Sequence, residues 1–83
     1  MFNKRTSDGR NNIVGKEIAR MRKELHISQR ELSDRLQLID LDIDKNAVQR
    51  IESGQRFVTD IELIYIAKVF GVSITELYGG EAK

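Results

Sequence analysis

Side chains that can pair with the edges of nucleic-acid bases are concentrated in residues 45–53. Asn and Gln can form two hydrogen bonds with adenine, and Lys and Arg can do the same with guanine. Four residues of these types fall on the predicted outward face of this segment: Lys45, Asn46, Gln49 and Arg50. This pattern fits direct reading of a base sequence. A structural alternative stays open, because the solvated face of any helix is polar.

A short helix must position these side chains. Ala47, Val48 and Ile51 recur at helical spacing and would face inward. Asp44 is a suitable N-cap, and Gly54 can adopt the left-handed conformation that ends a helix. We therefore expect a helix over residues 45–53.

Four further helices are predicted around it. An apolar stripe predicts a first helix from Asn12 to near Leu25, capped by Asn11 or Asn12, with His26 in a left-handed turn. Three capping boxes of the S/T-x-x-E type begin the other helices at Ser28, Thr59 and Ser73. The stripe consists of Val14, Ile18, Met21 and Leu25, and Leu32 and Leu36 face inward on the second helix.

The fourth predicted helix is the most apolar. Because apolar residues cover more than half of its circumference, we expect it to be the central core helix, ending at Gly71. Its apolar residues are Ile61, Leu63, Ile64, Ile66, Ala67, Val69 and Phe70.

Residues 37–44 are predicted to be an acidic loop of eight residues. Leu41 and Ile43 alternate with aspartates, which indicates an extended stretch anchored on one side, with Asp40 and Asp42 in water. A calcium loop counted from Asp40 would need Gly at position 6 and Glu at position 12, where this chain has Lys45 and Ile51. We therefore expect no metal.

The predicted fold is all-α, a compact bundle of five short helices. Residues 12–78 form the domain, between a flexible basic N-terminal arm (1–11, with Lys4, Arg5 and Arg10) and a flexible C-terminal end (79–83). The arm could contact DNA or be a plain terminus. The formal net charge of +1 averages an excess of four positive charges in residues 1–36 and of three negative charges in residues 37–83.

Several classes of function are disfavoured by composition. The chain has 83 residues, no Cys and a single histidine, His26, so no nucleophilic or metal-dependent active site is indicated and we expect no enzyme and no cofactor. No apolar run approaches the ~20 residues of a membrane span, and no small-molecule ligand is evident. We expect a cytoplasmic protein.

Three blocks of sequence resemble the Cro/Xre-type helix-turn-helix family of phage and bacterial repressors. They are ISQRELSDRLQL, NAVQRIESGQR and ELIYIAKVFGVSITEL, within residues 18–77. The resemblance implies a lambda-repressor-like DNA-binding domain. Its second helix would cross the DNA backbone, and its third would enter the major groove.

The resemblance also assigns roles to particular residues. Base contacts fall to Lys45, Asn46, Gln49 and Arg50, and contacts with the DNA backbone to Gln29, Arg22, Arg30 and Arg56. Glu52 would form a structural ion pair with Arg22. The family usually has a turn of about three or four residues between these helices, so the longer loop leaves the approach angle of the third helix open.

The implied partner is double-stranded DNA. We expect a transcriptional repressor that binds a palindromic operator as a homodimer, at least on DNA. The alternative is an antitoxin or adaptor that binds protein, with DNA binding secondary. Its contact surface would lie on the last two helices, although we expect most of their aromatic residues in the core: Phe57, Tyr65, Phe70 and Tyr78.

Overall fold

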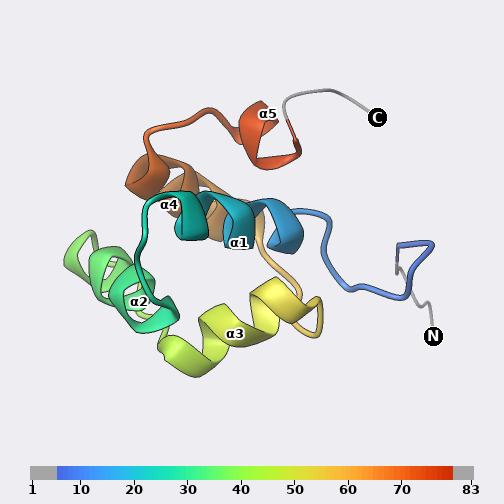
Figure 1. Ribbon diagram of the computed structural model, residues 1–83, viewed down its shortest axis with the longest axis horizontal. Coiled ribbons are helices and arrows are strands. Elements are labelled where there is room, and N and C mark those ends of the chain that lie inside the picture. The colour runs from blue at the N-terminus through green and yellow to red at the C-terminus, as the bar shows by residue number, and fades with distance from the viewer. Residues whose placement is uncertain (1–5, 80–83) are drawn as a thin grey trace.

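A computed structural model describes residues 6–79, and this part of the chain contains α-helices and no strand. The helices are α1 (Gly15–Glu24), α2 (Gln29–Leu38), α3 (Lys45–Ser53), α4 (Asp60–Phe70) and α5 (Ile74–Leu77) (Figure 1). The predicted all-α class is confirmed. Lys4 and Arg5 of the expected arm, and residues 80–83 of the expected C-terminal end, lie outside the described residues.

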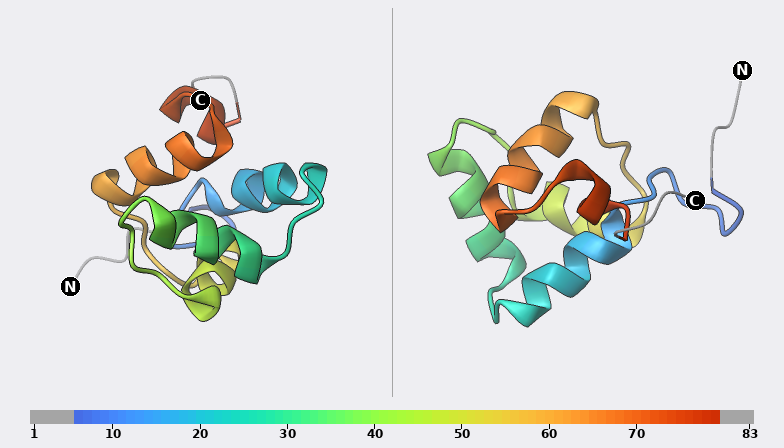
Figure 2. Two further views of the ribbon diagram at one scale, coloured as in Figure 1. Left: turned by 90° about the vertical axis from the view of Figure 1, so that its left-hand side faces the viewer. Right: turned by 90° about the horizontal axis from the view of Figure 1, so that it is seen from above.

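The helices surround one apolar core. In the arrangement of Figures 1 and 2, α3 packs against α1 and α2, and α4 packs against α2 and α5. The most completely buried side chains come from every helix and from the turn before α1: Val14, Ile18, Leu32, Leu36, Val48, Ile51, Ile66 and Leu77. The two helices expected to meet DNA, α2 and α3, are therefore fixed to each other by shared core residues.

Side-chain caps set most helix starts. The three predicted capping boxes are present at Ser28, Thr59 and Ser73. Asp44 Oδ1 accepts a hydrogen bond from the backbone N–H of Ala47 at 2.8 Å, so the predicted N-cap of α3 is confirmed. Gly54 ends α3 with φ +86°.

The first helix begins later than expected. It starts at Gly15 rather than Asn12, and the predicted N-cap at Asn11 or Asn12 is wrong, because Val14 occupies the N-cap position and has no side-chain cap. Asn12 still supports the helix start, since its side-chain oxygen accepts a hydrogen bond from the backbone N–H of Gly15 at 2.8 Å. Leu25 was expected in the buried stripe but is half exposed, since it already belongs to the turn that ends α1. The predicted left-handed turn at His26 is confirmed by φ +58°.

The loop before α3 is shorter than predicted. Helix α2 continues through Leu38, so the loop spans residues 39–44, and Gln37 within the helix donates to the Ile43 carbonyl at 2.9 Å. Asp40 reverses the chain with φ +75°, which aspartate tolerates better than most residues other than glycine. Ile43 is buried, and Asp42 is exposed as expected.

The prediction for α4 was wrong in part. Leu63, Ile66 and Ala67 are buried, but Ile61 is 63% and Ile64 47% exposed, because neighbouring elements cover only one side of this helix. No helix in residues 6–79 is long and apolar enough to span a membrane.

The aromatic residues of this region are also less buried than expected. Phe57 and Tyr78 are exposed, whereas Tyr65 and Phe70 are partly buried against the core.

Residues 6–11, which we expected to belong to a flexible arm, form hydrogen bonds within themselves and with the rest of the domain. Thr6 and Gly9 form a hydrogen-bonded turn. Arg10 then bonds to the end of α3, and Asn11 bonds to the segment that follows it. The described N-terminal segment lies beside the end of α3 in Figure 1. Periodicity gives no signal for such a contact, because the residues that meet are more than 40 positions apart.

Candidate nucleic-acid interface

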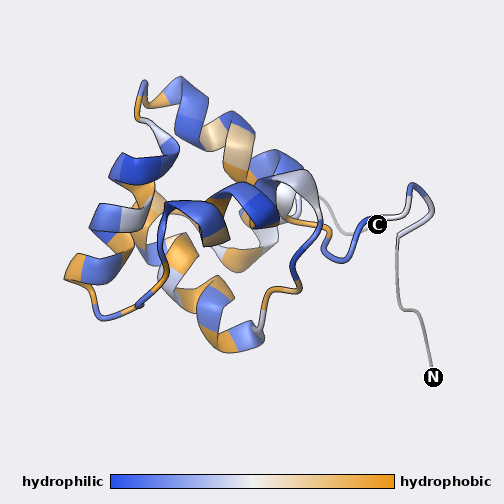
Figure 3. Ribbon diagram, turned by 90° about the horizontal axis from the view of Figure 1, so that it is seen from below, coloured by the Kyte–Doolittle hydropathy of each residue, from blue (hydrophilic) through white to orange (hydrophobic). Residues whose placement is uncertain are grey.

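The outward face of α3 carries the predicted base-reading residues. Lys45, Asn46, Gln49 and Arg50 are all exposed. On the opposite face, Val48 and Ile51 are buried and Ala47 is partly buried. Figure 3 views the molecule from the side on which α3 lies and shows hydrophilic residues along most of that helix. Core packing thus turns this polar face outward.

The start of α3 and the body of α2 share a shallow depression of about 270 Å³. Arg30 from α2 and Lys45 from α3 line it, so one predicted backbone contact and one predicted base contact lie at the same place. Two carboxylates, Asp34 and Asp44, also line it. The two cations therefore do not form an isolated positive patch.

The ion pair between Arg22 and Glu52 is present and largely buried. Arg22 Nε donates to Glu52 Oε2 at 2.7 Å and Nη2 to Oε1 at 3.0 Å, and the two side chains are 11% and 7% exposed. Arg22 Nη1 also donates to the carbonyl of Ile27. The Glu52 carboxylate raises the pKa of the Arg22 guanidinium. The pair joins α1 to the end of α3.

Gln29 contributes to the same cluster. Its Nε2 donates to Glu52 Oε1 at 3.0 Å, so one carboxylate receives donors from both α1 and α2. The residue assigned to a phosphate is therefore held by a side chain of α3. Sequence reasoning found Gln29 and Glu52 separately but missed their contact, because nothing in the spacing connects positions 23 apart.

Arg56 is occupied by an acidic partner. Its guanidinium donates two hydrogen bonds to the Glu62 carboxylate, at 2.9 and 2.8 Å, and one to the carbonyl of Phe57. The hydrogen bonds from Arg56 hold the pKa of Glu62 below its usual value, against the opposing effect of burial. Glu62 also completes the capping box of α4. Arg56 thus fixes the connection between α3 and α4.

Three polar residues before α1 were not assigned to this region by sequence reasoning. Arg10, Asn11 and Asn12 donate to backbone carbonyls at the end of α3 and in the segment after it. Asn12 was predicted only as a cap of α1, and Arg10 only as part of a mobile arm. Polar residues followed by an apolar helix give no indication that their partners lie so far away in the sequence.

Residues 18–77 match a protein family described as Helix-turn-helix. The matched segment covers more than half of the chain, and the chain belongs to this Cro/Xre-type helix-turn-helix family. It is a DNA-binding helix-turn-helix regulator. No curated protein and no solved structure gives a significant match.

Proposed function

We propose that this chain is a sequence-specific repressor that binds a palindromic operator as a homodimer and reads the major groove with α3. The observation that carries the proposal is the outward face of α3, where four side chains able to recognise bases are exposed above a buried apolar face. A rigid helix with such a face fits the major groove of B-form DNA.

The contacts divide into two groups. Lys45, Asn46, Gln49 and Arg50 supply the base contacts, because their side chains are exposed and can donate to or pair with base edges. Among the predicted backbone contacts, Arg30 is the exposed cation on α2. Gln29, Arg22 and Arg56 approach the phosphates while bound to Glu52 or Glu62, so they position α2, α3 and the connection. The two arginines also contribute positive charge.

Modest non-specific affinity follows from the charges. Non-specific binding depends on cations that replace counterions at phosphates. The chain has a net charge of only +1, and two of its arginines are paired with carboxylates next to the site. Base contacts and the pairing of two subunits must then provide most of the specific affinity.

A dimer is supported by the two-fold symmetry of palindromic operators and by apolar surface near α3 and α4. Phe57, Ile61 and Ile64 are exposed. Phe57 lies in the connection before α4, and the two isoleucines lie near the start of that helix. The same residues favour the second candidate function, an antitoxin or adaptor that binds another protein. Size-exclusion chromatography of the protein with and without operator DNA separates a preformed dimer from one formed only on DNA.

Selection of bound sequences from a random pool of DNA tests the proposal directly. We expect a palindrome with half-sites separated by about one helical turn, ~10 base pairs. Asn46→Ala should weaken binding to the selected sequence about tenfold and relax the preference at one base position. Ser53→Ala, on the same helix but outside the predicted contacts, is the matched control. Absence of binding even at low salt would contradict the proposal and favour the adaptor.

A further inference from the structure

The chain before α1 closes the C-terminal end of α3. The last carbonyl groups of a helix have no partner within it and need donors from elsewhere. Arg10 Nη2 donates to the carbonyl of Glu52 at 2.6 Å and lies 3.4 Å from that of Ile51. Asn12 Nδ2 lies 2.9 Å from the carbonyl oxygen of Ile51 and 2.8 Å from that of Arg56. Two side chains from outside the matched family segment thus hold the end of the predicted recognition helix.

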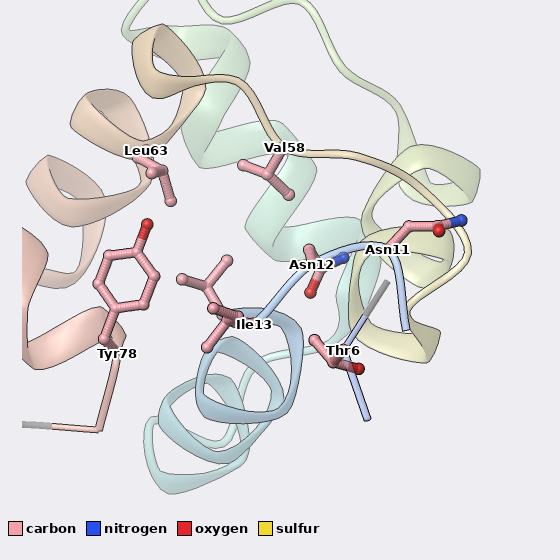
Figure 4. A pocket seen from close by; sticks show the side chains of 8 residues that line it. Thr6, Asn11, Asn12, Ile13, Val58, Leu63 and Tyr78 are labelled. Atoms are coloured by element: carbon pink, nitrogen blue, oxygen red, sulfur yellow. The ribbon is translucent and has the colours of Figure 1, made fainter. Parts of the chain in front are cut away.

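Asn11 extends these contacts into the connection after α3. Its backbone N–H donates to the carbonyl of Gly54 at 2.7 Å, and its Nδ2 to that of Gln55 at 3.0 Å. Figure 4 shows Asn11 and Asn12 at one edge of a groove of about 320 Å³ that Val58, Leu63 and Tyr78 also line. We call residues 10–12 the N-terminal clamp.

Two glycines make room for the clamp. A Cβ atom on Gly54 would lie 2.8 Å from Arg10 Cζ, and one on Gly15 would lie 2.1 Å from the carbonyl oxygen of Ile51. A side chain at either of these two positions would push the clamp or the start of α1 away from α3. The close approach is therefore built into the sequence on both sides of the contact.

The charge of the clamp also suits its position. The C-terminal end of a helix carries a partial negative charge that a guanidinium stabilises. Helix α3 has only 9 residues, which is too short to be stable without tertiary contacts. At the C-terminal end, the clamp and the Arg22–Glu52 pair add polar contacts to the packing of the buried Ile51 side chain.

We propose that Arg10 is a positioning residue for base recognition. Acting through the N-terminal clamp, it fixes the angle at which α3 enters the major groove and does not itself touch DNA. Base-reading side chains must be held within about 0.5 Å of their productive positions, so a helix released at one end loses discrimination between sequences. This inference rests on the proposed function, because it assumes that α3 reads bases.

The experiment compares Arg10→Ala, Arg10→Lys and the wild type, with Lys16→Ala as the matched control. Lys16 is an exposed cation close to the clamp whose side chain bonds to Asp8 and not to α3. Dissociation constants are measured for the selected operator and for random DNA over a series of salt concentrations, well below the melting temperature. Amide hydrogen exchange at residues 50–54 is followed in the free proteins.

We expect Arg10→Ala to lower the ratio of specific to random affinity about tenfold, the loss of roughly one good base contact. The salt slope should stay unchanged, because it counts the phosphates that are neutralised. Exchange at residues 50–54 should accelerate, Arg10→Lys should recover part of the ratio, and Lys16→Ala should leave it unchanged.

Three results would overturn the inference. A salt slope smaller by about one, with equal losses on both DNAs, would make Arg10 a phosphate contact. A lower melting temperature with an unchanged affinity ratio would make the clamp purely structural. Unchanged exchange at residues 50–54 would show that Arg10 does not hold α3. If the wild type prefers no sequence, the proposed function itself is refuted. The dissociation constants of the wild type for the selected operator and for random DNA distinguish this outcome from failure of the inference.

Discussion

The N-terminal end of α3 is held by a neighbour in the chain, whereas its C-terminal end is held by residues far away. Asp44 directly precedes the helix that it caps and bonds to the N–H of Ala47. At the other end, Arg22, Asn12 and Arg10 bond to α3 across 30, 39 and 42 positions of sequence. The first end can adjust together with its loop, and the second is part of the rigid body.

This difference matters for recognition. In the helix-turn-helix family, the N-terminal residues of the recognition helix meet the base edges. In this chain the N-terminal end of α3 has a local cap. The C-terminal end, which is held by residues far away in the sequence, fixes the direction of the helix axis. Changes at the C-terminal end should therefore affect the fold most, and changes at the N-terminal end should affect α3 alone.

Breaking the buried ion pair should have the largest effect. Glu52→Ala leaves the guanidinium of Arg22 and the amide of Gln29 without their shared partner, and removing one member of a buried pair costs about 3 kcal/mol. Thermal denaturation followed by circular dichroism should show a melting temperature lower by about 10 °C or more. Glu24→Ala, which breaks an exposed pair with Arg20, is the control. An unchanged melting temperature would contradict the structural role assigned to Glu52.

A pair of glycine substitutions separates the contribution of the clamp to the unfolding free energy from the contribution of backbone strain. Gly54 and Gly71 both end helices in the left-handed region, with φ +86° and +67°. Gly71→Ala meets no atom within 4 Å and should cost about 1 kcal/mol of unfolding free energy from strain alone. Gly54→Ala should cost about 2 kcal/mol, because it also displaces the Arg10 side chain. Equal costs in urea denaturation would mean that the clamp adds nothing to stability.

At the N-terminal end, the effect should be smaller and local. Asp44→Ala removes the cap of α3 and should cost about 1 kcal/mol, whereas Asp44→Ser should retain most of the stability. Hydrogen exchange should accelerate at the first turn of α3 and not at residues 50–54. Acceleration at both ends would contradict the separation between them.

The smallest effect concerns pH and the link from Arg56 to α4. The pKa of Glu62 is lower in the folded than in the unfolded protein, so the unfolded state binds more protons as the solution is acidified. The stabilisation is complete above the ordinary pKa of 4.5 and is lost as pH falls through the depressed value. Urea denaturation from pH 7 to pH 3 should show Glu62→Gln less stable at neutral pH and less sensitive to acid. Parallel pH profiles for the two proteins would argue against this link.

Local signals predicted much of the fold. Capping residues and apolar spacing located all five helices in residues 6–79, and α3 has the predicted bounds, because caps and periodicity act within one or two turns. The turn at His26 followed from the tolerance of histidine for the left-handed region. The Arg22–Glu52 pair came from the family resemblance rather than from spacing.

Long-range packing is what the sequence alone could not supply. Nothing near Arg10 indicates that its partner is the carbonyl of Glu52, because every residue offers the same carbonyl group. The exposure of Ile61 and Ile64 depends on which side of α4 its neighbours cover. The continuation of α2 through Leu38 depends on Gln37 reaching the carbonyl of Ile43.

The position of the clamp has a consequence for engineering. A chimera that exchanged only the matched residues 18–77 with a relative would transfer α3 while leaving Arg10 and Asn12 behind. Such a graft would keep every side chain expected to meet DNA and would lose donors to the backbone of the transplanted helix. Residues 10–77 are therefore the smallest unit that moves the helix together with the N-terminal clamp.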